Sequence, residues 1–170
     1  MRPRMRKTIV VIHVIASVAL VGEVWGLVLL NTAARLAKDP ALTHSAYQLM
    51  APQVFAGGIP LSLIALISGI TLGLTSHWGL FRHSWVAAKL VLLLAVVGVG
   101  MFLVDPEGMA AATSGGRSVT EARQWAQVAA LGLQIAMLMT ATALSVFKPR
   151  RGIRAATWPS GVVADPVESR

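Results

Sequence analysis

The sequence predicts an all-α protein, a bundle of four transmembrane helices with both termini in the cytoplasm. The first observation is composition: 55% of the residues are hydrophobic and only 13% are charged, whereas a soluble domain carries about 25% charged residues. The second is four long apolar runs, which indicate helices because lipid offers backbone polar groups no partner outside the chain. The third is the grouping of basic residues near both ends of the chain, which predicts the orientation.

Each apolar run is long enough for a helix to cross about 30 Å of hydrocarbon. The runs cover residues of about 8–30, 54–75, 85–104 and 125–147. The first run follows a basic segment, as the apolar part of a signal peptide does. It exceeds the roughly 7–15 apolar residues of a signal peptide, so we expect it to be retained as the first helix.

Short motifs predict where two helices begin. Asp39 and Pro40 fit an N-cap followed by proline at the first helical position, which predicts a short interfacial helix to about Met50. Residues 118–121 fit a capping box. The fourth membrane helix is therefore expected to begin near Val119.

The net charge of +8 is distributed as the positive-inside rule requires. Basic residues precede the first run, lie in the short second loop and recur in residues 148–170, which are expected to form a disordered, basic cytoplasmic tail. Arg in excess over Lys, with abundant Ala, Val and Gly, is typical of a bacterium with GC-rich DNA. We therefore expect a multi-pass protein of the bacterial plasma (inner) membrane, surrounded by the lipid bilayer, with no nucleic-acid partner.

Polar residues inside the apolar runs form a candidate intramembrane polar site. His13, Ser17 and Glu23 share one broad face of the first helix at about 100° per residue, and Gln134 or Gln127 on the fourth helix is expected to hydrogen-bond to Glu23. A charge at this depth costs on the order of 2–3 kcal/mol, so these side chains should face protein or water. Two interpretations stay open: Glu23 and His13 mark the ends of a polar transport path, or Glu23 is an interhelical contact alone.

Small residues form a stripe along the second helix and are predicted to pack against another helix. The stripe comprises Gly58, Ser62, Gly69 and Gly73. Small side chains let two helix backbones approach closely in a membrane, although glycine is also simply common in membrane helices. This face makes the chain a candidate homo-oligomer or a candidate partner in a larger membrane complex.

Catalytic and metal-binding signatures are sparse. The chain has no cysteine, which excludes disulfides, thiolate metal ligands and covalent haem attachment. It contains neither a G-x-S-x-G nor an H-E-x-x-H motif, so we predict no catalytic residue and no metal site, and favour a protein that is not an enzyme. His13 is the only histidine well inside a run, and with His83 it leaves haem b or copper open as a cofactor. Solvated loop histidines and packed methionines explain the same residues.

Two short stretches carry a resemblance to known families. His13 followed by Trp25 and Gly26, and the stretch WGLFRHSWVAAKLVL at residues 78–92, resemble small four-helix integral membrane families of bacteria that have no established activity. The same pattern is more distantly similar to the copper-resistance D-type membrane domain. The resemblance covers roughly the first 105 residues. It implies a four-helix membrane fold and, through the distant likeness, copper handling; Glu23 is not part of the pattern.

These observations favour a small accessory or transport-type membrane component. One alternative is a haem- or copper-binding protein for redox chemistry or metal handling, which a Soret band or stoichiometric copper in the purified protein would support. Another is an assembly partner that uses the glycine-rich face of the second helix, which purification with a fixed partner would support.

Overall fold

The computed structural model describes residues 3–75 and 84–147. Within these ranges the chain forms helices and no strand, which confirms the all-α prediction. In chain order the elements are α1 (Pro3–Leu36), α2 (Pro40–Gln53), the π-helical turn η1 (Val54–Gly58), α3 (Ile59–Thr75), α4 (Ser84–Phe102), α5 (Pro106–Thr113), the 3-10 turn η2 (Ser114–Gly116) and α6 (Glu121–Phe147). The expected tail at residues 148–170 and His83 lie outside the described residues.

Four helical stretches of the described chain are long and apolar enough to cross a membrane, as an integral membrane protein requires. They are Pro3–Leu36, Pro40–Thr75, Val86–Gly116 and Glu121–Ser145. Only 11% to 22% of the most apolar window of each stretch is buried within the chain. Large apolar side chains such as Val18 (67% exposed) and Ile67 (64% exposed) therefore lie on the outer surface. Such a surface suits lipid and is unfavourable in water.

The second membrane stretch is one long helix that includes a π turn. Asp39 caps its start, because the side-chain Oδ1 accepts a hydrogen bond from the backbone N–H of Ala41 at 2.9 Å. This confirms the predicted start at Pro40. The predicted end near Met50 is wrong: α2 continues through Pro52 and η1 directly into α3. The interfacial helix and the second span are therefore one element.

The connection between α4 and α6 contains a helix that the motifs above did not predict. Asp105 caps α5 as Asp39 caps α2, and its Oδ1 accepts from the N–H of Gly108 at 2.9 Å. Gly115 and Gly116, with φ of 70° and 77°, follow α5 in a left-handed conformation that glycine adopts at low cost. They let the chain reverse toward α6.

The last helix begins two residues later than the capping box predicts. It starts at Glu121, and the carbonyl of Thr120 accepts from the N–H groups of Arg123 and Gln124 at 3.1 and 3.2 Å. The prediction of a start near Val119 is corrected accordingly. In addition, Arg123 forms an ion pair with Asp105 (Nη2 to Oδ2, 2.6 Å), which ties the start of α6 to the start of α5.

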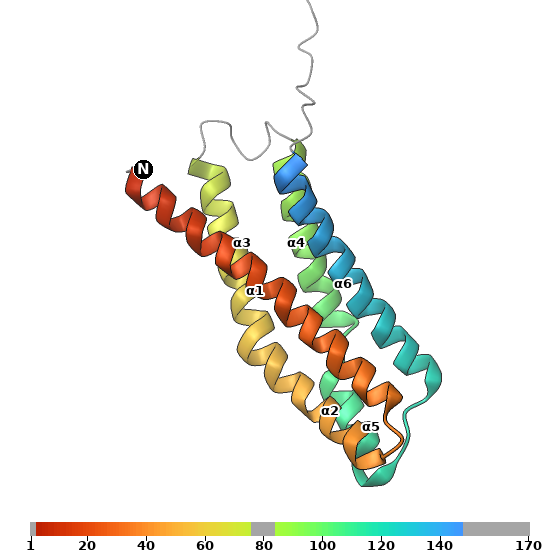
Figure 1. Ribbon diagram of the computed structural model, residues 1–170. Helices are drawn as coiled ribbons and strands as arrows, with labels where there is room; N and C mark the ends of the chain where they lie inside the picture. Colours follow the sequence, from red (N-terminus) through yellow and green to blue (C-terminus); the bar gives the residue numbers. More distant parts are fainter. Residues whose placement is uncertain (1–2, 76–83, 148–170) are drawn as a thin grey trace, which may run out of the picture.

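The four long helices form two pairs, α1 with α3 and α4 with α6 (Figure 1). The pairs diverge toward the end that holds the amino terminus and converge at the opposite end, which α2 and α5 close (Figure 1). We call these the open end and the closed end. At the closed end His44 Nδ1 lies 2.9 Å from Thr113 Oγ1, and the Arg35 guanidinium lies 4.0 Å from the ring centre of Trp125.

Two apolar clusters hold the helices together. The larger lies at the closed end and includes Leu27, Tyr47, Met50, Met109 and Leu131. The smaller lies where α1 crosses α4 and α6 and consists of Leu20, Val24, Val96 and Leu138. Packing is therefore concentrated between the crossing and the closed end.

Candidate functional site: a cavity between the helix pairs

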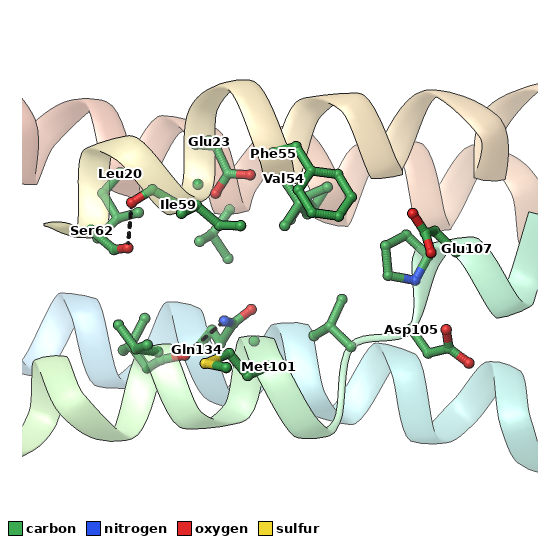
Figure 2. A pocket seen from close by; sticks show the side chains of 18 residues that line it. Leu20, Glu23, Val54, Phe55, Ile59, Ser62, Met101, Asp105, Glu107 and Gln134 are labelled. Carbon is green, nitrogen blue, oxygen red and sulfur yellow. Dashed lines mark hydrogen bonds between the residues drawn. The ribbon is translucent and has the colours of Figure 1, made fainter.

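A cavity of about 390 Å³ lies between the two helix pairs. Its lining comes from α1, η1, α3, α4, α6 and the start of α5 (Figure 2). The polar side chains of the lining are those of Glu23, Ser62, Asp105, Glu107 and Gln134. Every charged residue in this lining is acidic. The rest of the wall is mainly apolar.

Glu23 enters the cavity from the middle of α1 and packs against the π turn. A Cβ atom added to Gly58 would lie 3.1 Å from Glu23 Oε1, and one added to Gly57 would lie 3.2 Å from Glu23 Cγ. The two glycines therefore leave the room that the Glu23 side chain occupies. Glu23 Oε1 is buried and has no hydrogen-bond partner among the described residues.

The backbone beside Glu23 is held by the same turn. Gln53 Nε2 donates to the carbonyl oxygen of Glu23 at 2.8 Å, across from α2 to α1. Its side chain lies so close to Gly26 that a Cβ there would meet Gln53 Nε2 at 2.5 Å. Gly26 therefore leaves room for the Gln53 side chain, and the hydrogen bond from Gln53 fixes the position of Glu23 along α1 relative to η1.

Gln134 faces Glu23 from the other side of the cavity (Figure 2). Its side chain is 5% exposed, and its Nε2 donates to the carbonyl oxygen of Val96 on α4 at 3.0 Å. Its Oε1 is buried without a partner in the described part of the chain. Burying an unpaired polar atom costs about 1–3 kcal/mol. The two residues that carry such an oxygen, Glu23 and Gln134, thus line one cavity.

The expected hydrogen bond between Glu23 and a glutamine of the fourth helix is not formed. Gln134 and Glu23 share the cavity, but the Gln134 amide group donates to Val96 instead. Gln127 is buried nearer the closed end, where its Oε1 accepts from the backbone N–H of Asp105 at 3.3 Å. Gln134 therefore links α6 to α4, and Gln127 links α6 to the start of α5.

His13 and Ser17 lie on α1 outside the lining of this cavity. His13 Nδ1 is 3.0 Å from both the carbonyl oxygen of Ala65 and Oγ of Ser68 on α3. A Cβ on Gly69 would lie 3.1 Å from His13 Cε1. The His13 ring therefore joins α1 to α3, and the cavity does not connect it with Glu23.

The small-residue stripe of α3 and η1 faces α1 at some positions and the cavity at another. Gly58 and Gly69 contact side chains of α1, namely Glu23 and His13. Ser62 lines the cavity, and its hydroxyl donates to the carbonyl oxygen of Ile59 at 2.8 Å (Figure 2). Gly73 is buried. Contacts within the chain thus already cover much of the glycine-rich face that an assembly partner would need.

The acidic residues of the lining that lie at the closed end were missed as site residues in the sequence. Asp105 and Glu107 lie at the start of α5, between the third and fourth apolar runs, and both are exposed. The Asp105-Pro106 pair repeats the Asp39-Pro40 pattern and was the signal that could have located this helix.

The haem and copper hypotheses find no ligand set among the described residues. Residues 3–75 and 84–147 contain no group of three or more His, Asp or Glu side chains placed to hold a metal ion. One ring nitrogen of His13 is engaged by α3, and His83 lies outside the described ranges. Haem and copper stay predictions from the sequence alone.

No protein-family model matches the chain. No curated protein and no solved structure matches it significantly either. The resemblance to four-helix bacterial membrane families and to the copper-resistance D-type domain therefore stays a prediction.

Proposed function

We propose that the chain is a small transport-type component of the bacterial inner membrane, oriented with both termini in the cytoplasm, and that the cavity holds a polar solute on its way across. One observation carries the proposal: Glu23 and Gln134 line one cavity between the helix pairs, and each carries a buried side-chain Oε1 that has no partner among the described residues. Such atoms are costly unless a ligand or water supplies the missing donor.

The depth of Glu23 supports this proposal. Glu23 lies seven residues before the end of its apolar run at residue 30, which is about 10 Å at 1.5 Å per residue. An ionisable residue this deep in a membrane helix marks a functional site by default, because its insertion costs about 2.5–3.5 kcal/mol on translocon scales. The cavity leads from this level toward Asp105 and Glu107, which are exposed at the closed end (Figure 2).

Transport requires that the cavity face each side of the membrane in turn, and thiol labelling tests this. The chain has no cysteine, so Ser62→Cys places a single thiol in the cavity lining. We expect a membrane-impermeant thiol reagent to modify this variant from either side in oriented vesicles. Labelling from one side only, or from neither, would contradict transport.

Two further variants control the sidedness of the vesicles. Ser114→Cys places the thiol at the closed end, and Thr75→Cys places it at the open end. Each is expected to react from its own side alone. With both controls sided in this way, labelling of Ser62→Cys from both sides reports on the cavity rather than on leaky vesicles.

A further inference from the structure

We propose that the cavity binds a small organic cation, a primary ammonium group carried on an apolar chain or ring; this rests on the proposed function only in taking the cavity as the solute site. The polar atoms of the cavity would hold the ammonium group. The apolar wall would hold the rest of the molecule.

The polar lining offers acceptors and few donors. Glu23 Oε1 and Gln134 Oε1 are buried and without partners among the described residues. The donors nearby are already used: Gln134 Nε2 bonds to Val96, and the Ser62 hydroxyl bonds to Ile59. A primary ammonium group carries three N–H donors and no acceptor, which matches this set.

The charge of the lining selects a cation over an anion. Glu23, Asp105 and Glu107 line the cavity, and no Lys or Arg does. Arg123 balances Asp105 through their 2.6 Å ion pair, so Glu23 on α1 and the exposed Glu107 on α5 remain as the acidic groups that attract a solute. An anion would meet carboxyl groups and no basic partner.

The size and the apolar wall select an organic cation over a metal ion. The volume of about 390 Å³ falls within the roughly 300–1,000 Å³ of small-molecule sites. Ile59, Val54 and Phe55 lie on the same side of the cavity as Glu23, and Met101 lies on the side of Gln134 (Figure 2). Such walls suit a hydrocarbon body. A hard metal ion instead takes six or more oxygen ligands.

Titration calorimetry of the purified full chain in detergent tests the inference with benzylammonium chloride as the probe. Benzyl alcohol has the same ring without the charge, benzyltrimethylammonium has the charge without an N–H, and benzoate has the opposite charge. We expect benzylammonium to bind at least about tenfold more tightly than any of the three, because hydrogen bonds between charged groups are roughly twice as strong as neutral ones.

Matched variants then assign the binding to the cavity. Glu23→Gln is expected to weaken benzylammonium binding about tenfold or more, whereas Glu121→Gln should leave it unchanged, because Glu121 is exposed at the start of α6 and outside the lining. Should Glu23→Gln not fold, Gln134→Met serves instead: it removes the unpaired Oε1 and keeps a similar volume. It should weaken benzylammonium and leave benzyl alcohol unchanged.

Equal affinity for benzyl alcohol and benzylammonium, unchanged affinity in both variants, or no binding of benzylammonium would each overturn the inference. The titration is done in detergent and does not depend on solute crossing a membrane. Two-sided labelling of Ser62→Cys without benzylammonium binding would therefore reject the ligand class and keep transport. Binding with one-sided labelling would reject transport and keep the ligand class.

Discussion

The Glu23 side chain depends on two residues that have no side chain of their own. A Cβ atom on Gly57 of the π turn would lie 3.2 Å from Glu23 Cγ, and one on Gly58 would lie 3.1 Å from Glu23 Oε1, both tighter than ordinary van der Waals contact. The π turn is a rare form of helix that occurs frequently at functional sites. Here its glycines bring the backbone of η1 against an ionisable group deep in the bundle.

Gly58→Ala tests this contact against Gly98→Ala. A Cβ at Gly98 meets nothing within 4 Å, so alanine there should stabilise the helix by about 0.5–1 kcal/mol. At Gly58 the new methyl group crowds the carboxyl group, and overpacking costs about 1–3 kcal/mol. We therefore expect a lower thermal midpoint for Gly58→Ala than for Gly98→Ala in detergent. Equal midpoints would mean that Glu23 moves aside without cost.

Polar residues could be located from the sequence, but their partners could not. The polar face of α1 predicted that Glu23 and His13 point inward, and both lie against α3 or η1. The hydrogen bond from Gln134 to the carbonyl oxygen of Val96 forms because α4 and α6 approach each other closely. Gly100 permits that approach, since a Cβ there would lie 2.9 Å from Gln134 Nε2. Such a distance is a property of the packed bundle and leaves no periodic signal in the sequence.

At the scale of the helices, contacts between polar groups hold each pair together. His13 joins α1 to α3 through Ala65 and Ser68, and Lys89 Nζ donates to Ser145 Oγ between α4 and α6 at 2.5 Å. Lipid tails are as apolar as leucine, so helix association in a membrane depends on close packing and on such hydrogen bonds. The pairs thus stay closed where the bundle as a whole diverges.

Gly69→Leu is expected to separate α1 from α3. The added side chain would meet the His13 ring, which already lies 3.1 Å from an ideal Cβ at this position. Overpacking costs about 1–3 kcal/mol, so the thermal midpoint in detergent should fall. Gly132→Leu is the control, because Gly132 is exposed and a Cβ there meets nothing within 4 Å. A Gly69→Leu variant as stable as the control would place this face in lipid.

Asp105→Ala is expected to loosen α5. The substitution removes both the cap on Gly108 and the ion pair with Arg123. Loss of an N-cap costs about 0.5–2 kcal/mol, whereas the exposed ion pair contributes about 0–1 kcal/mol. Hydrogen exchange of the α5 amides should therefore rise, while exchange in α3 stays unchanged. Asp105→Asn keeps a capping side chain and should retain most of the protection.

A local motif predicted the start of α2, whereas the continuation of this helix beyond Met50 depends on tertiary packing and was missed. Asp39 and its proline located the start of α2. Pro52, which lacks an N–H group and commonly ends a helix, lies within α2, and the helix continues through η1 without a break. Packing of η1 on Glu23 and of Gln53 on Gly26 accompanies that continuation, and neither contact is local in sequence.

At the scale of the whole molecule, composition was sufficient to predict the class. The four apolar runs form four helical stretches that suit a membrane. In lipid the backbone N–H and C=O groups must hydrogen-bond within the protein, which leaves few structures other than helices. The cavity was not predictable in this way. Its lining comes from six elements, and Glu107 on α5 and Glu23 on α1 border the same space although the two helices make no contact with each other.

Reporter fusions test the predicted orientation of the whole chain. Fusions after Arg150 and near Gly79 should report the cytoplasm, and fusions near Thr43 and Ser114 should report the outside, because the basic residues gather on the side of both termini. Signals of alkaline phosphatase and of a cytoplasmic fluorescent protein provide the two readouts. An outside signal at Arg150 would require an odd number of spans.

The divergence of the two helix pairs makes the pair of α1 and α3, which His13 joins, a lever. Its fulcrum is the crossing near Leu20 and Val24, where the smaller apolar cluster holds it against α4 and α6. From Glu23 to the start of α1 at Pro3 the arm is twenty residues, roughly 30 Å at 1.5 Å per residue, so a tilt of about 5° displaces its tip by about 2–3 Å. A small adjustment of the cavity wall is therefore amplified at the open end, where a pair of spin labels at Thr8 and Ser145 would register the displacement as a change in distance.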